Sequence, residues 1–215
     1  MVEKLNRDVI ARAGLKLLDK SGIEGVTMRE LAAELGVRAP TLYWHVKSKQ
    51  DIFRTMAVTM SADAATRMAT LDPDAPWQDR IMNWAVALRR TLLEHRDGAR
   101  VFAGTFAADP ATFQVTESVL RAWRDGGLPI PDAALPTALL RHFIVGFCIE
   151  EQALEQFRQA SGDTHLEELN AVIDPATFPL TAQAFPVILG SSPEHRFELG
   201  IRLILSGIAA SAATA

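Results

Sequence analysis

Apolar side chains recur every three or four residues near the N-terminus, and interruptions of this pattern divide the segment into short helices. The first series covers residues 5–18 and predicts an amphipathic helix that ends at Ser21-Gly22. A second, shorter helix is expected after Thr27. Thr27 and Glu30 match a Thr-x-x-Glu capping box, and Gly36 is a typical helix stop.

A third helix is expected over residues 41–46, because Pro40 fits a first turn, where its missing N–H leaves no hydrogen bond unmade. Leu42 and Val46 lie four residues apart and can anchor this helix to a core. Ser48 then caps a longer helix. Two short helices joined by a glycine-containing turn and braced by a preceding helix have the helix-turn-helix arrangement.

Beyond residue 66 the pattern remains helical, and Gly- and Pro-rich breaks separate its segments. No stretch alternates apolar and polar residues as a strand does, so the chain is expected to be all-α. We predict a helix-turn-helix DNA-binding domain over residues 1–50 and a connecting helix over 51–66. A larger helical ligand-binding and dimerisation domain is expected over 67–215.

Two later segments, residues 135–149 and 197–208, carry apolar side chains on more than one helix face. A helix of this kind is buried on two sides. One face is expected to pack within the chain and the other against a second copy, which predicts a homodimer joined by a four-helix bundle. Gly200 and Gly207 would let these helices approach closely.

The composition, with 48% apolar and 22% charged residues, is that of an ordinary globular protein. The apolar stretch 199–215 is interrupted by Arg202 and Ser206 and is shorter than the roughly 20 residues of a membrane span. The N-terminus lacks the apolar segment of a secretory signal. Cys148 has no second cysteine with which to form a disulfide. A cytoplasmic protein without a membrane partner is expected.

Charge is distributed unevenly along the chain. Residues 1–50 hold nine Lys and Arg against six Asp and Glu, whereas the rest of the chain holds thirteen against twenty. A small basic module attached to an acidic body suits an anionic partner at one end, here double-stranded DNA. Thr41, Tyr43, Trp44 and His45 would then face the major groove. The alternative is that Tyr43 and Trp44 are core aromatics and His45 an ordinary surface residue.

Several motifs resemble the tetracycline repressor (TetR) family. In the N-terminal module they are residues 25–29, 31–32, 35–37 and 40–49; in the C-terminal part they are 94–101, 104–105 and 146–152. The resemblance implies a ligand-responsive transcriptional regulator, a repressor that binds a palindromic operator as a homodimer and is released by a small-molecule effector. It places DNA contacts at Arg29, Pro40, Thr41, Tyr43, Trp44, His45 and Lys49.

Two neighbouring positions depart from the family pattern. Ala39 replaces a glutamine that reads bases in tetracycline repressors, and Arg38 replaces an acidic residue. An amide can hydrogen-bond the edge of adenine at two points, and alanine cannot. Arg38 and Ala39 are therefore expected at the DNA, on an operator of different sequence.

The effector site departs further. Tetracycline repressors hold a magnesium–drug complex with a histidine, which is Phe102 here, and their polar ring corresponds to Ala65, Trp84 and Ser118. Thr105 and Glu150 are retained. We expect an apolar or aromatic effector, with no metal and no cofactor. The expected lining is Met60, Trp84, Phe102, Thr105, Phe106, Ser118, Trp123, His142, Phe143, Phe147 and Glu150. Alternatively, Trp84 and Phe102 fill the space and leave a constitutive regulator, and His142 is a core residue.

Other functions are less consistent with the sequence. An enzyme would need a nucleophile with its base, a phosphate loop or a metal set, and no such motif is found. His165 with its neighbouring glutamates is interpreted as a solvated loop, and Glu150, Glu151 and Glu155 as an exposed edge or a pocket rim. An interaction module that had lost DNA binding would predict a damaged recognition helix, whereas residues 41–49 are intact.

Overall fold

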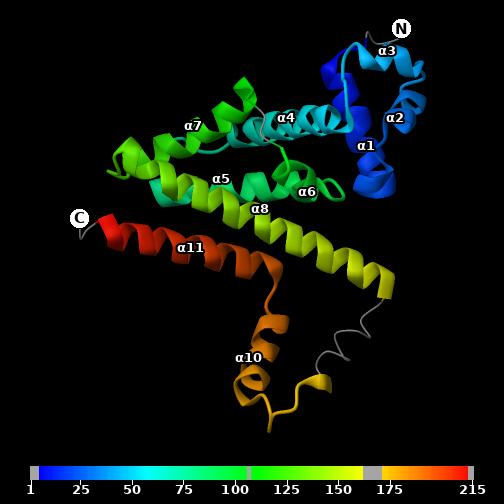
Figure 1. Ribbon diagram of the computed structural model, residues 1–215. Coiled ribbons are helices and arrows are strands. Elements are labelled where there is room, and N and C mark those ends of the chain that lie inside the picture. The colour runs from blue at the N-terminus through cyan, green and yellow to red at the C-terminus, as the bar shows by residue number, and fades with distance from the viewer. Residues whose placement is uncertain (1–4, 106–107, 162–170, 213–215) are drawn as a thin grey trace.

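The computed structural model describes residues 5–105, 108–161 and 171–212, and these contain helices and no strand, which confirms the all-α prediction. The N-terminal helices are α1 (Arg7–Gly25), α2 (Met28–Glu34), α3 (Ala39–Tyr43) and α4 (Lys49–Met68). The remaining helices are α5 (Trp77–Leu93), α6 (Gly98–Ala103), α7 (Pro110–Asp125), α8 (Ile130–Ser161), α10 (Pro179–Gly190) and α11 (Pro193–Ala212) (Figure 1).

Local hydrogen bonds explain where the first helices begin. The side chain of Thr27 accepts a hydrogen bond from the backbone N–H of Glu30 at 3.2 Å, and Ser48 accepts one from Asp51 at 3.1 Å, as the capping patterns predict. Gly36 has a φ of 64°, which suits the end of α2. Gly22, with a φ of 69°, interrupts α1 without ending it, since the helix resumes and continues to Gly25.

The third helix differs from its predicted bounds. It begins at Ala39, two residues earlier than expected, and ends at Tyr43 rather than Val46. The early start follows from Pro40, whose fixed φ suits either of the first two helical positions. Leu42 and Val46 are nevertheless fully buried and anchor this segment to the core, as predicted.

Helix α4 connects the N-terminal module to the larger helical body. It packs against α1 on one side and against α5, α6 and α7 on the other, so one core continues through both parts of the chain. In the body, α8 crosses beside α5, α6 and α7, and α11 lies along α8 (Figure 1). Helix α4 therefore links α5, α6 and α7 to the N-terminal module through one shared core.

Helix α8 is long and apolar enough to cross a membrane by length and composition alone, a feature the sequence analysis did not identify. Its position is that of the central helix of the body. Leu140, Ile144 and Cys148 are buried among the surrounding helices, and Arg141 and Gln152 are polar members of the same helix. Burial raises the pKa of the Cys148 thiol to about 12, so this thiol is protonated and unreactive.

Helices α8 and α11 meet closely at a glycine. A Cβ atom on Gly200 would lie 2.3 Å from the ring of Phe143, so a larger residue at this position would require the ring to move. The expected close approach at Gly200 is thus found within one chain. Gly207 has no neighbouring atom within 4 Å and lies beside an exposed groove.

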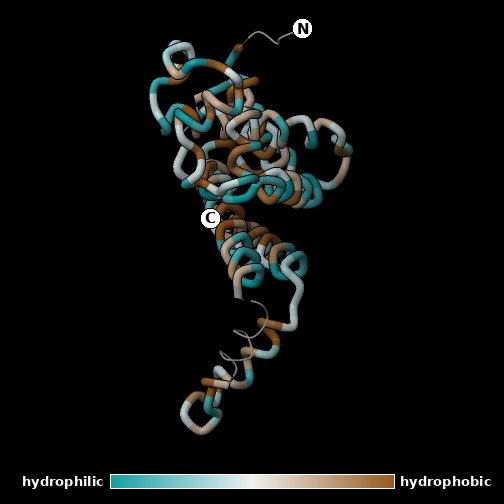
Figure 2. The backbone as a smooth tube through the Cα atoms, turned by 90° about the vertical axis from the view of Figure 1, so that its right-hand side faces the viewer, coloured by the Kyte–Doolittle hydropathy of each residue, from teal (hydrophilic) through white to brown (hydrophobic). Residues whose placement is uncertain are grey.

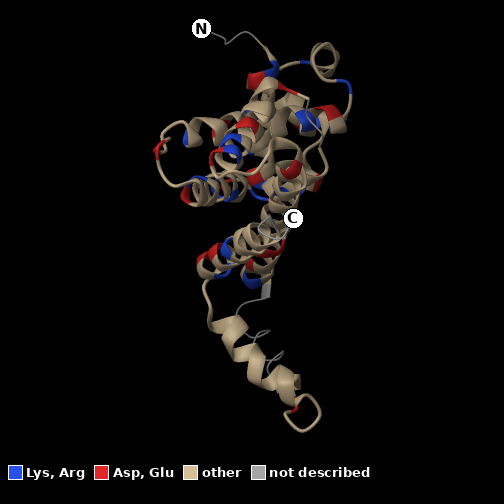
Figure 3. Cartoon of the chain, turned by 90° about the vertical axis from the view of Figure 1, so that its left-hand side faces the viewer, with Lys and Arg blue, Asp and Glu red and all other residues tan. Residues whose placement is uncertain are grey.

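Helix α10 projects away from the body (Figure 2). None of its residues is buried, although it includes Leu180, Val187, Ile188 and Leu189. It carries no charged side chain, in contrast to the helices of the body (Figure 3).

Candidate DNA-binding surface and effector site

The short segment at and just after α3 has one buried face and one exposed face. Leu42 and Val46 point inward and are fully buried, while the side chains of Tyr43 and Trp44 are 51% and 88% exposed. The alternative that these aromatics belong to the core is therefore wrong. Two large aromatic side chains held in water by a rigid anchor are free to contact a partner.

The other predicted DNA contacts surround these aromatics in the sequence. Arg29, Arg38, Pro40 and Thr41 are exposed, and Ala39 and His45 are half-buried. The exposed members leave donors and apolar area available on the same module. The structure contains no DNA, so these contacts remain predictions.

Lys49 has a role within the chain that the sequence did not indicate. Its ammonium donates a hydrogen bond of 2.9 Å to the carbonyl oxygen of Ile23 and lies 5.4 Å from the centre of the Phe53 ring. The side chain thus ties the start of α4 to the end of α1. An ammonium has three N–H groups, so two remain for a phosphate.

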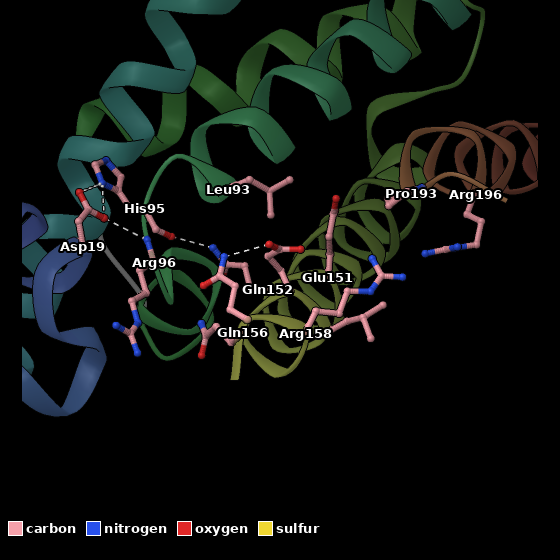
Figure 4. A pocket seen from close by; sticks show the side chains of 13 residues that line it. Asp19, Leu93, His95, Arg96, Glu151, Gln152, Gln156, Arg158, Pro193 and Arg196 are labelled. Carbon is pink, nitrogen blue, oxygen red and sulfur yellow. Dashed lines mark hydrogen bonds and ion pairs between the residues drawn. The ribbon is translucent and has the colours of Figure 1, made fainter. Parts of the chain in front are cut away.

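The turn between α5 and α6 joins the N-terminal module to the body (Figure 4). The carboxylate of Asp19 on α1 accepts a hydrogen bond of 3.0 Å from the backbone N–H of Arg96, and lies 3.0 Å from Nδ1 of His95. The carboxylate of Asp97 accepts a hydrogen bond of 3.0 Å from the backbone N–H of Ile23. The N-terminal module and the body therefore each supply a carboxylate that accepts a hydrogen bond from a backbone N–H of the other.

Two glutamines of α8 form hydrogen bonds with the same turn and its flanking helices. Gln152 accepts a hydrogen bond from the N–H of Ala99 at 3.2 Å and donates to the carbonyl oxygens of Leu92 and His95 at 3.0 and 2.7 Å. Gln156 donates to Asp97 at 3.2 Å. A continuous set of hydrogen bonds therefore links α6 and α8 to α1.

Asp97 is charged at the centre of this set and has a φ of 57°, unusual for a residue other than glycine. Burial raises the pKa of its carboxyl, but hydrogen bonds from Ile23, Gln156 and Arg100 outweigh burial and leave the pKa below its ordinary value. The sequence motifs at residues 94–101 and 146–152 contain His95 and Gln152, which are joined by a hydrogen bond. The number of residues between the two motifs could not indicate that they meet in the fold.

The predicted effector residues fall into three groups. Met60, Trp84, Phe102, Thr105 and Trp123 are buried in the body, as the filled-core alternative expects. Phe143 and Phe147 are directed at Phe197 of α11, with ring centres 5.8 and 5.3 Å away. Ser118, His142 and Glu150 are exposed, so His142 is not a core residue in this chain. Phe106 lies outside the described residues.

Trp84 and Ser118 share a cavity of about 420 Å³ between the end of α4, α5 and α7. Met68 and Leu71 add apolar surface, and Arg121 lies at its edge. The indole N–H of Trp84 donates to the carbonyl oxygen of Val115 at 3.1 Å, which fixes the ring in the wall of the cavity. Phe102 and Thr105 do not line this cavity.

Glu151 belongs to a largely buried ion pair rather than to an exposed edge, and it lines two surface pockets, in agreement with its alternative interpretation as a pocket rim. Arg89, 8% exposed, donates to both carboxylate oxygens of Glu151 at 2.9 and 2.5 Å and to Glu194 of α11 at 3.3 Å. Its guanidinium also lies 5.2 Å from the ring centre of Phe197. Burial lowers the pKa of Arg89, and these two carboxylates more than offset burial, so the pKa is raised.

Within the part of the chain that the structure describes, no group of three or more His, Cys, Asp and Glu side chains is placed to hold a metal ion. His165, which the sequence analysis interprets as part of a solvated loop, lies outside the described residues.

A helix-turn-helix with an exposed aromatic surface, joined by one long helix to a larger helical body, defines the class of two-domain helix-turn-helix transcriptional regulators. Known families agree with this class. Residues 10–56 match the model of bacterial regulatory proteins, tetR family, and residues 70–212 match the tetracyclin repressor-like C-terminal domain. The chain belongs to the TetR family.

Individual relatives cover nearly the whole chain. Tetracycline repressor protein class E of Escherichia coli is 36% identical over 96% of this chain and 92% of its own length. The crystal structure of a possible TetR family transcriptional regulator from Streptomyces coelicolor A3(2) is 34% identical, with a TM-score of 0.83, over 96% of this chain and 100% of that one. ActR of Streptomyces coelicolor, in complex with actinorhodin, is 25% identical with a TM-score of 0.83 over 98% and 99%.

Proposed function

We propose that this protein is a homodimeric repressor that binds a palindromic operator in the cytoplasm and is released by a small apolar or aromatic effector. The observation that carries the proposal is the α3 surface, where Tyr43 and Trp44 are exposed above buried Leu42 and Val46. A rigid helix with exposed aromatic and polar side chains can enter the major groove. The role of a regulator also explains the basic charge of the N-terminal module.

Dimerisation is supported by apolar side chains that face solvent on the two helices expected at the interface. On α8 these are Leu135 and Leu139, and on α11 they are Leu199 and Leu203. Leu139 and Leu203 line the same groove, and contiguous exposed apolar side chains mark interaction surfaces. A twofold axis through this bundle would present two α3 helices to one face of DNA.

The effector is proposed to bind in the body. ActR, which is similar to this chain, has been crystallised in complex with actinorhodin. Phe102 stands in place of the metal histidine, so a magnesium–drug complex would lose its nitrogen ligand. Since Phe102 is buried and does not line the cavity beside Trp84, an effector that contacts Phe102 must bind a conformation in which the surrounding helices separate. The hydrogen bonds of Asp19 and Asp97 would transmit this movement to α1.

Substitutions on the N-terminal module should separate base contacts from phosphate contacts. We expect Tyr43→Ala to weaken specific operator binding by about 1–3 kcal/mol, roughly 5- to 150-fold, and to relax the preferred sequence. Lys49→Ala should weaken binding to all sequences and lower the salt slope by about one unit. Fluorescence anisotropy with operator and random DNA at several salt concentrations measures both effects.

The matched control is Phe113→Ala, which removes an aromatic side chain of similar exposure, 61%, from α7 in the body. It should leave DNA binding unchanged. Footprinting should protect two half-sites about one helical turn apart, roughly 34–36 Å. A single protected half-site at saturating protein would contradict the dimeric repressor.

Effector release should be independent of magnesium. Titration of the operator complex with a panel of aromatic compounds should identify some that weaken operator binding about 5- to 150-fold, the range of a coupling of roughly 1–3 kcal/mol. The same release is expected in EDTA, because Phe102 cannot bind a metal ion. Release by tetracycline that requires magnesium would show that the metal argument is wrong. Failure of every compound would favour the filled-core alternative.

A further inference from the structure

Arg141 is a half-buried cation beside the predicted effector site. It lies on α8, and its guanidinium carbon is 5.3 Å from the ring centre of Phe102 on α6. This contact holds the planar guanidinium over the ring that replaces the metal histidine. The guanidinium of Arg141 therefore lies beside Phe102 in the body.

Two other arginines of the body with limited exposure have carboxylate partners. Arg89 binds Glu151 and Glu194, and Arg80 binds Asp125 at 2.7 Å. Arg141 has no hydrogen bond or ion pair with any residue of the described chain. Its five N–H donors have no acceptor among the described residues, and none of them is sealed from solvent, so they are available to a ligand.

The electrostatic surroundings agree with this geometry. Burial lowers the pKa of Arg141, and no acidic side chain opposes that effect, whereas two glutamates raise the pKa of Arg89. An arginine remains charged even so. The body therefore holds an uncompensated positive charge next to an aromatic ring.

We propose that Arg141 binds an acidic group of the effector, so that the effector is an aromatic anion such as a carboxylate or sulfonate. The inference rests on the proposed effector site. Arginine donates two parallel hydrogen bonds to a planar acid, and the apolar part of such a molecule would lie against Phe102. Arg141 would thus select acids over neutral compounds of the same shape.

The test uses two fluorescent probes of the same aromatic skeleton. 8-Anilinonaphthalene-1-sulfonate is an anion, and N-phenyl-1-naphthylamine lacks the sulfonate. We expect the wild-type protein to bind the anion about 10- to 100-fold more tightly, the value of a hydrogen bond to a charged group. Arg141→Met should remove this preference and leave the affinity for the neutral probe unchanged, and Arg141→Lys should retain part of it.

The control is Arg54→Met, because Arg54 is an exposed arginine of α4 that is paired with Asp51 and lies outside the effector cavity. It should keep the preference for the anion. The proposal is overturned if the wild-type protein binds neither probe, binds both equally, or keeps its preference in Arg141→Met. It is also overturned if the Arg141→Met protein melts at a lower temperature, since Arg141 would then stabilise the fold. Dissociation of the dimer in Arg141→Met would overturn it too, since Arg141 would then pair with a second copy.

Operator binding without a probe is measured on the same proteins. Arg141→Met should bind operator DNA as the wild-type protein does. If the wild-type protein binds no DNA but prefers the anionic probe, the repressor fails and the acid-binding role of Arg141 stands. The two proposals can therefore fail separately.

Discussion

A Leu203→Asp protein is expected to be a folded monomer that no longer binds the operator tightly. The side chain of Leu203 is 64% exposed in the single chain, so aspartate there is tolerated by the fold. In the proposed dimer it would bury an unpaired charge, at a cost of several kcal/mol. Ile204, by contrast, packs partly against the core, so its substitution would also disturb folding.

Loss of the dimer should reduce specific operator affinity about 10³-fold or more, to the level of non-specific binding, because each monomer reads only one half-site. Sedimentation at micromolar concentration and gel-shift titration measure the two effects. Phe113→Asp, at 61% exposure on α7, is the control and should remain dimeric. A Leu203→Asp protein that sediments as a dimer would place the interface elsewhere.

Glu151→Ala is expected to lower the free energy of unfolding by about 3–5 kcal/mol. The substitution leaves the buried Arg89 with only Glu194, whose single contact is 3.3 Å long and whose side chain is largely exposed. The loss of stability comes from the remaining arginine, whose charge would be only weakly compensated between α5, α8 and α11. Urea unfolding at one fixed chain concentration measures the loss.

Replacing both partners tests this reasoning. Arg89→Met combined with Glu151→Leu should recover most of the lost stability, because no charge remains buried. Glu117→Ala, which breaks an exposed pair with Arg121 on α7, should cost less than about 1 kcal/mol. If the double variant is as unstable as Glu151→Ala, the ion pair itself stabilises the junction of the three helices.

The N-terminal module was predictable because its determinants are local. Thr27, Gly36, Pro40 and Ser48 act on residues within one helical turn, and each is found in the expected role. The bounds of α3 were less accurate, because Pro40 tolerates more than one helical position. Inward orientation of Leu42 and Val46 followed from their spacing alone.

The body was less predictable because its contacts join distant residues. Arg89 and Glu151 are 62 positions apart, and Asp97 reaches Ile23 across 74. Nothing in the local pattern indicates which charged residue meets which. The effector lining was assembled from matching positions, so it could not reveal that Phe143 and Phe147 turn toward Phe197 of α11.

The contact between α1 and the α5–α6 turn has a consequence for exchanging modules between regulators. Two of its bonds use the backbone N–H groups of Ile23 and Arg96, which almost any residue provides. The side-chain requirement on the N-terminal module is therefore a carboxylate at position 19, since Asp97 travels with the body. A chimera that joins a foreign helix-turn-helix module to this body would keep these bonds if its first helix carries an acid at that position. New operator preferences could then be grafted onto an unchanged ligand-binding half.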